Sequence, residues 1–250
     1  MGRGAEAAAA HAADMTLLVG RSAAALVAGK VSRRDFVDQA YDIGVGSLPL
    51  VIVSAILSGI VTSQQGGYQF TGSVPLYILG SVVTSSIVLE LGPLMTAFVI
   101  IGRVGARITA ELGTMKVSEQ IDALYALGRD PVRVLAAPRI LAGVLVMPIL
   151  VGLADMVGVF AGMTAAQHTL GLGREAFLYG ARRFWHDWDF LYSLTKALAF
   201  GFVIPLIAVH VGLRARGGAE GVGRATTNSV VFMILAVLCL DTLFPPLLLG

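Results

Sequence analysis

The chain has 250 residues, of which 56% are hydrophobic and only 14% are charged. A typical soluble domain is about 45–50% apolar and about 25% charged, so the composition excludes a disordered chain, a nucleic-acid-binding domain and an ordinary cytosolic enzyme. The net charge of +2 is too even to indicate a polyanionic partner, and the single cysteine, Cys239, cannot form an internal disulfide. The mean hydropathy of +0.80 favours a membrane protein.

Residues 1–32 are rich in alanine and are predicted to form a cytoplasmic tail or an interfacial helix. Arg21 interrupts their only apolar stretch, whereas a cleaved signal peptide needs an apolar core of about 7–15 residues. Directly after them, a set of apolar residues recurs at helical spacing opposite a polar face: Phe36, Val37, Ala40 and Tyr41. This pattern predicts an amphipathic helix in the inner membrane interface, with a soluble packed helix as the alternative.

Five stretches reach the length of about 20 residues that a transmembrane helix needs. They cover approximately residues 43–63, 73–102, 140–166, 190–213 and 227–249. The second stretch is longer than a bilayer requires, so it should tilt, kink or protrude. Gly92-Pro93 is the expected break in it, because proline removes a helical hydrogen bond and clashes with the preceding turn. The predicted fold is therefore an all-α membrane protein with about five spans.

Lys and Arg residues set the expected orientation of these spans. They concentrate before the first span, between the second and third spans and between the fourth and fifth, whereas the loop 64–72 contains none. Basic residues are enriched in cytoplasmic loops. The sequence therefore predicts a cytoplasmic N-terminus and a C-terminus on the outer side.

The loop between the second and third spans contains a short predicted helix. Ser118 is expected to cap its N-terminus, where Glu119 suits the helix dipole. Gly128 is expected to close the C-terminus, and Asp130-Pro131 to prevent continuation. One face of this helix is formed by Ile121, Leu124 and Tyr125. From spacing alone, that face either docks into a groove on a partner protein or folds back on this protein's own inner surface.

Four ionisable residues fall within the predicted spans, where charge is costly and by default indicates function: Glu90, Asp155, Lys196 and Asp241. At about 1.5 Å per residue, Lys196 lies roughly 9 Å from the outer end of its span and Asp241 roughly 12 Å, with Asp155 at a similar level. Lys196 is therefore predicted to pair with Asp241 or Asp155, either as a structural link or as part of a functional site. Glu90 is expected to lack a cation at its own depth and to be protonated, hydrated or cavity-facing.

Two parts of the chain resemble a known family. The central part reads LELGPLMTAFVIIGRVGARITAELGTMKVSEQIDALYALGRDPVRVLAAPR, and the C-terminal part contains GVGRATTNSVV followed by LAVLCLD. These runs resemble the MlaE-type permeases, the membrane subunits of ABC lipid transporters that work with mammalian-cell-entry (MCE) domain proteins. The resemblance covers roughly residues 33–250, which we expect to form one permease domain.

The resemblance implies a homodimeric permease in the inner membrane of a diderm bacterium. Two cytoplasmic ATPase subunits would dock on a coupling helix, and a ring of MCE-domain subunits would lie on the periplasmic side. The substrate would be phospholipid, moved between the inner and outer membranes, which maintains lipid asymmetry. The partner ATPase would bind ATP and Mg²⁺, and this chain would bind no cofactor.

Some family roles carry over to residues of this sequence. The coupling helix falls on the segment Ser118–Leu127, which assigns ATPase coupling to Ser118, Glu119, Ile121, Asp122, Leu124 and Tyr125. The carboxylate that faces the central lipid cavity in the family is Glu90 here, with Leu89 and Pro93 beside it in the expected lipid pathway. The residue before this carboxylate is often basic in relatives, so Leu89 argues against a lipid-phosphate contact at that point.

Missing motifs argue against catalysis by this chain. The sequence has no GxxxxGK[ST] phosphate loop, no HExxH and no GxSxG, so it is predicted to be a transport subunit without ATPase activity. No metal site is expected, because His186 lies in an aromatic segment typical of an interface anchor. One alternative is an intramembrane lipid-modifying enzyme using Glu90, Asp155 and Asp241, although these acids are expected at different depths. Another is an ion-coupled secondary transporter, which would show an inverted repeat that we do not see.

Overall fold

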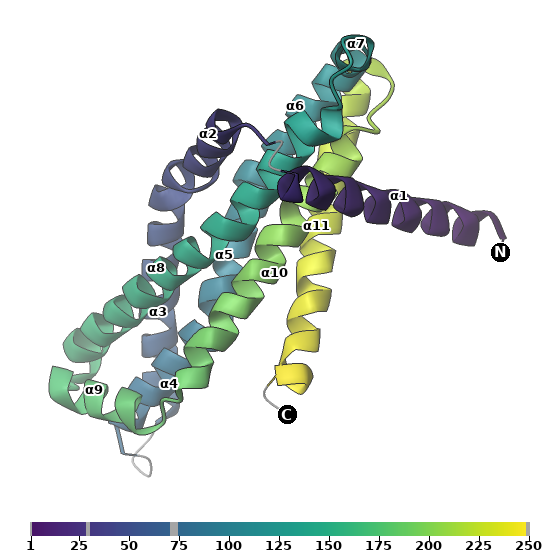
Figure 1. The fold of residues 1–250 in the computed structure, drawn as a ribbon. Coiled ribbons are helices and arrows are strands. Elements are labelled where there is room, and N and C mark those ends of the chain that lie inside the picture. Colours follow the sequence, from purple (N-terminus) through teal and green to yellow (C-terminus); the bar gives the residue numbers. More distant parts are fainter. Residues whose placement is uncertain (1, 29–30, 71–74, 249–250) are drawn as a thin grey trace. The chain divides into compact units, whose positions relative to one another are not determined.

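A computed structural model describes residues 2–28, 31–70 and 75–248, and the regular elements within these ranges are all helices (Figure 1). The predicted all-α class is thus confirmed. The α-helices are α1 (Gly2–Val27), α2 (Arg33–Ile43), α3 (Leu48–Gln69), α4 (Ile78–Ser86), α5 (Gly92–Ile100), α6 (Ala106–Val117), α7 (Gln120–Ala126), α8 (Ala137–Leu170), α9 (Arg174–Arg183), α10 (Asp187–Gly212) and α11 (Gly218–Leu248).

Five helical segments of the described residues are long and apolar enough to cross a membrane, as predicted. They cover Arg33–Gln69, Ile78–Val117, Val132–Leu170, Asp187–Gly212 and Gly218–Leu248. Each extends beyond the predicted apolar stretch at one end or at both, because flanking polar residues continue the helix, whereas the second begins at Ile78 rather than at residue 73. In the first segment, α2 continues through the short 3₁₀ turn Val45–Ser47 into α3, and the interfacial position predicted for α2 stays a prediction.

The second spanning segment is continuous, so the predicted break at Gly92-Pro93 was wrong. The π-helical turn Ile87–Leu91 joins α4 to α5, and a second π-helical turn, Ile101–Gly105, joins α5 to α6. Pro93 lies in the first turn of α5, directly after the wider π turn. The π turn therefore admits the proline ring without ending the helix.

The chain forms two compact units, and the long helices α8, α10 and α11 contribute to both. Residues 46–99, 147–200 and 240–250 make up one unit. Within it, α3 crosses α8 at very short range, since a Cβ atom on Gly59 would lie 2.1 Å from the carbonyl oxygen of Gly158. Helices α4 and α9 lie side by side around the buried Leu79, Val83 and Phe177 (Figure 1). The small residues thus allow backbone contact within one chain.

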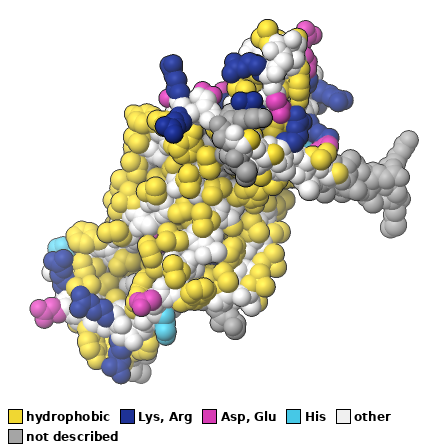
Figure 2. Space-filling model, in the orientation of Figure 1, with side chains coloured by type: hydrophobic (Ala, Val, Ile, Leu, Met, Phe, Trp, Pro, Cys, Tyr) yellow, Lys and Arg dark blue, Asp and Glu magenta, His cyan; other side chains and the backbone are white. Residues whose placement is uncertain are grey.

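Residues 1–45, 100–146 and 201–239 form the other unit. Here ion pairs join helix ends and loops: Arg21 of α1 to Asp130 at 2.9 Å, Arg139 of α8 to Glu111 of α6 at 2.7 Å, and Arg214 to Asp14 of α1. Basic side chains gather over the ends of α2, α6 and α7 in Figure 2. The alanine-rich N-terminal segment is therefore a helix held by ion pairs, with Leu18 and Ala25 buried.

Candidate functional site

Lys196 is the centre of a charged cluster inside the spans. Its side chain lies on α10 and is fully buried. The ammonium Nζ donates to Glu90 Oε2 at 2.8 Å and to the backbone oxygen of Leu89 at 3.0 Å. Asp241 Oδ1 of α11 lies 2.6 Å from the same Nζ atom. The ammonium group thus hydrogen-bonds to Glu90 and Leu89, and its contact with Asp241 is an ion pair.

The backbone explains why the Leu89 oxygen needs a donor. In an α-helix this carbonyl would accept from the N–H of residue 93, but that residue is Pro93, which has no N–H. A buried carbonyl without a donor is costly. Lys196 supplies a donor from another helix, so one side chain binds the backbone of the π turn Ile87–Leu91 and neutralises acids from two spans.

Glu90 lies in the π turn Ile87–Leu91 and contacts Lys196 directly. The expectation that Glu90 has no cation at its own depth was therefore wrong, as was the expectation that it lies at a different depth from Asp241. The two carboxylates differ in exposure, since the side chain of Glu90 is 46% exposed and that of Asp241 is 10% exposed. The cluster thus presents a carboxylate outward and keeps its ammonium inside.

Aromatic rings cover the buried side of the cluster. The ring centroid of Tyr192, one turn before Lys196 on α10, lies 5.3 Å from Nζ. Phe244 of α11 meets both Tyr192 and Phe200 edge to face, at centroid distances of 6.3 and 6.4 Å. A cation over a ring face is stabilised by the ring quadrupole. The sequence analysis missed Tyr192, although its i, i+4 spacing to Lys196 was a usable signal.

Asp155 of α8 does not belong to this cluster. Its carboxylate accepts from the Ser193 hydroxyl at 2.8 Å. Of the two partners predicted for Lys196, the structure has Asp241, and it adds Glu90, which was not predicted as a partner. The other carboxylate oxygen, Oδ1, is buried without a hydrogen-bond partner among the described residues. That oxygen approaches the start of α5 so closely that a Cβ atom on Gly92 would lie 1.7 Å from it.

Replacement of Gly92 with alanine should therefore destabilise the chain by about 1–3 kcal/mol, the usual cost of overpacking a core. Gly152 of α8 provides a matched control, because a Cβ atom there would meet nothing within 4 Å. We expect Gly92→Ala to lower the thermal unfolding temperature in detergent and Gly152→Ala to leave it unchanged or higher. Equal unfolding temperatures for the two variants would contradict the close approach of Asp155.

A helix is present where the coupling helix was predicted, but its start differs from the prediction. Helix α7 begins at Gln120, and Ser118 ends α6 by donating its hydroxyl to the Thr114 oxygen at 2.7 Å. The prediction of Ser118 as the N-cap was thus wrong. Glu119 joins the two helices with a left-handed backbone (φ 61°), and Lys116 contacts Asp122 at 2.9 Å, which fixes the turn.

The end of α7 follows the prediction. Gly128 adopts φ +70°, its N–H donates to the Tyr125 oxygen at 3.0 Å, and the Arg129 N–H donates to the Leu124 oxygen at 2.9 Å. These two bonds define a Schellman motif. The aspartate of Asp130-Pro131 then starts the next helix, because its carboxylate accepts from the Val132 N–H at 3.0 Å.

The apolar face of α7 is divided between the interior and the surface. Ile121 is buried and Leu124 is half-buried, whereas Tyr125 is 53% exposed. Leu127, directly after the helix, is 74% exposed. Ile121 therefore attaches α7 to its own chain, and Tyr125 and Leu127 form an outward apolar surface, which the sequence analysis assigned only in part.

Comparisons with known proteins agree with this architecture. The model of the family described as Permease MlaE matches residues 36–246. A probable ABC transporter permease protein of Synechocystis sp. is 37% identical over 85% of this chain and 81% of its own length. One from Rickettsia typhi is 38% identical over 82% of this chain and 80% of its own. The chloroplastic protein TRIGALACTOSYLDIACYLGLYCEROL 1 of Arabidopsis thaliana is 31% identical over 91% of this chain and 65% of its own.

Proposed function

This chain belongs to the MlaE permease family of ABC transporter permeases, and we propose that it moves phospholipids between the inner and outer membranes. The name of the Arabidopsis relative is that of a glycerolipid, which supports a lipid as the cargo. A separate ATPase subunit would supply the energy, with ATP and Mg²⁺ bound by that subunit. The chain itself would provide the lipid pathway.

The half-exposed Glu90 carboxylate supports this proposal most directly. It lies in a helix whose mean hydropathy qualifies it as a membrane span. Hydrocarbon cannot solvate a carboxylate, so an exposed acid at this level needs water or polar head groups beside it. A path along which lipid head groups pass through the membrane meets that need, and Leu89 and Pro93 would border it.

The partners follow from the family rather than from contacts within this chain. We propose a homodimer in the bacterial inner membrane, with a cytoplasmic N-terminus and a periplasmic C-terminus. The ATPase would dock on the surface formed by Tyr125 and Leu127, and an MCE-domain protein would bind on the periplasmic side. In this arrangement α7 is the coupling helix that transmits nucleotide-driven movement to the spans.

Reconstitution tests the proposed cargo. The chain is co-expressed with the ATPase and MCE-domain proteins of its source, and the complex is placed in donor vesicles that contain a fluorescent phospholipid. We expect ATP-dependent transfer of that lipid to acceptor vesicles. An assembled complex that hydrolyses ATP but moves no phospholipid would overturn the proposal.

Substitutions of Glu90 test the lipid pathway in the same assay. We expect Glu90→Ala to reduce transfer more than it reduces assembly, and Glu90→Gln to be milder, because the amide oxygen still accepts from Lys196. Glu175→Ala, an exposed acid of α9, serves as the control. A Glu90→Ala variant that is stable and transfers lipid at the wild-type rate would remove Glu90 from the pathway.

A further inference from the structure

Helix α1 is attached by ion pairs to two loops that join spanning segments. Its Arg21 side chain binds Asp130 at 2.9 Å, in the link 127–131 between α7 and the third spanning segment. Arg214, in the loop between α10 and α11, binds Asp14 of the same helix. The two α1 residues are seven positions apart, which places them on one face of the helix. Helix α1 therefore bridges the two loops, and it precedes the residues that match the family model.

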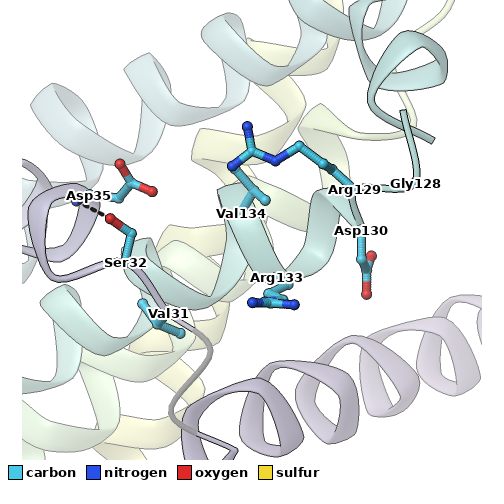
Figure 3. A pocket seen from close by; sticks show the side chains of 8 residues that line it. All are labelled: Val31, Ser32, Asp35, Gly128, Arg129, Asp130, Arg133 and Val134. Atoms are coloured by element: carbon cyan, nitrogen blue, oxygen red, sulfur yellow. Dashed lines mark hydrogen bonds between the residues drawn. The ribbon is translucent and has the colours of Figure 1, made fainter. Parts of the chain in front are cut away.

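Asp130 occupies a central position in the link, because one of its carboxylate oxygens serves two elements. Its Oδ1 atom accepts from the Val132 N–H at 3.0 Å and from Arg21 at 2.9 Å. Figure 3 shows the Asp130 side chain directed toward α1. A cavity of about 500 Å³ lies between the link and Ser32 (Figure 3), so side-chain packing does not fix the link on that side. The position of the link therefore depends on its contact with α1.

The attachment of α1 is weak enough to be released. Both ion pairs are partly exposed, and exposed ion pairs contribute little to stability. The helix packs against the π turn Val132–Ala136, and its buried apolar side chains among the described residues are Leu18 and Ala25. On the same face, the Ser22 hydroxyl is buried without a hydrogen-bond partner among the described residues, which opposes the contact. A small change in free energy therefore shifts α1 between an attached and a released form.

We propose that α1 is a releasable strap that determines how much of a movement of α7 reaches the third spanning segment. Arg21 is its positioning residue and acts through Asp130. This inference rests on the proposed function, in which α7 receives movement from the ATPase. With α1 attached, the link is held, so a displacement of α7 moves the start of the spanning segment. With α1 released, the link bends and part of the displacement is lost there.

Hydrogen–deuterium exchange of the full chain in detergent tests the strap without the ATPase or a lipid. The double variant Asp14→Asn/Arg21→Gln removes both ion pairs, and we expect the amides of residues 129–136 to exchange at least about threefold faster. Ser22→Ala should act in the opposite direction and slow this exchange, because it removes the unpaired buried hydroxyl. Equal exchange rates in the wild type and in Asp14→Asn/Arg21→Gln would overturn the strap.

The matched control removes an exposed ion pair that lies outside α1. Glu220 and Arg224 of α11 form such a pair at 3.5 Å, and Glu220→Gln/Arg224→Gln should leave the exchange of residues 129–136 unchanged. An acceleration equal to that of the α1 double variant would assign the effect to lost charge in general and would contradict the strap.

The transfer assay with the reconstituted complex tests the coupling role. We expect Asp14→Asn/Arg21→Gln to lower the number of phospholipids transferred per ATP hydrolysed by at least about twofold, while the ATPase still co-purifies. Ion pairs with a purely structural role would change the yield of the complex but not this ratio, so an unchanged ratio would overturn the coupling role. A wild-type complex that hydrolyses ATP without moving phospholipid would contradict the proposed function and the coupling role with it, whereas the exchange experiment decides the strap by itself.

Discussion

Replacement of Lys196 with alanine should abolish recovery of the folded chain from membranes. The substitution leaves the acids Glu90 and Asp241 without their cation and the Leu89 oxygen without its donor. Removing one partner of a buried ion pair costs about 3–5 kcal/mol, which is a large part of the usual stability of a protein. Yield in detergent and the thermal unfolding temperature measure the effect.

Lys116 offers a matched control for this experiment. Its Nζ also lies 2.9 Å from an aspartate, Asp122, but both partners are partly exposed. Exposed ion pairs contribute about 0–1 kcal/mol, so Lys116→Ala should fold normally. If Lys196→Ala is as stable as Lys116→Ala, the charged cluster does not hold the π turn Ile87–Leu91, α10 and α11 together.

Replacement of both Tyr125 and Leu127 with aspartate should abolish co-purification of the ATPase while the permease remains folded. Both side chains are more than half exposed, so the change does not disturb the interior. It places two unpaired charges in the proposed apolar contact, where desolvation opposes binding. The measurement is a pull-down from detergent extracts. We expect the double variant to recover at least about tenfold less ATPase than the wild type does.

Tyr68→Asp is the control for this double variant, because Tyr68 is 83% exposed at the end of α3. It adds a charge at an exposed aromatic position away from α7 in the sequence. Normal ATPase recovery with the Tyr125→Asp/Leu127→Asp chain would exclude this surface as the docking site. Ile121 is unsuitable for the test, because its substitution would disturb the buried contact that attaches α7 to the chain.

The spans were predictable because their signal is additive. Each needs only length and apolar composition, and small local exceptions do not cancel a run of about 20 residues. Gly128 was also predictable, since a left-handed backbone at a helix end strongly favours glycine. Ser118 was not, because its hydroxyl has a second option, a bond back to the carbonyl of Thr114 at the end of α6. Sequence alone does not choose between these two bonds.

The charged cluster was predicted only in part. Counting residues from span ends gives a depth but not the direction in which a side chain points. Asp155 and Asp241 were therefore equivalent partners for Lys196, although Asp155 faces Ser193 and Gly92. The prediction for Glu90 was wrong for a different reason. Glu90 lies in the π turn Ile87–Leu91, and a π turn changes the direction in which its side chains point. Pro93 follows Leu89 by four residues. This spacing was the available signal that the Leu89 carbonyl lacks its α-helical N–H donor.

The contact between Lys196 and the Leu89 oxygen also makes positions 93 and 196 epistatic. As long as residue 93 is proline, an uncharged residue at 196 leaves both a carbonyl and two acids uncompensated. In α-helical geometry an N–H at position 93 donates to the Leu89 oxygen, so the loss of the lysine then exposes only the acids. The order of substitution therefore matters: a lineage that exchanges Pro93 first can later discard Lys196 at lower cost, whereas the reverse order passes through the least stable intermediate.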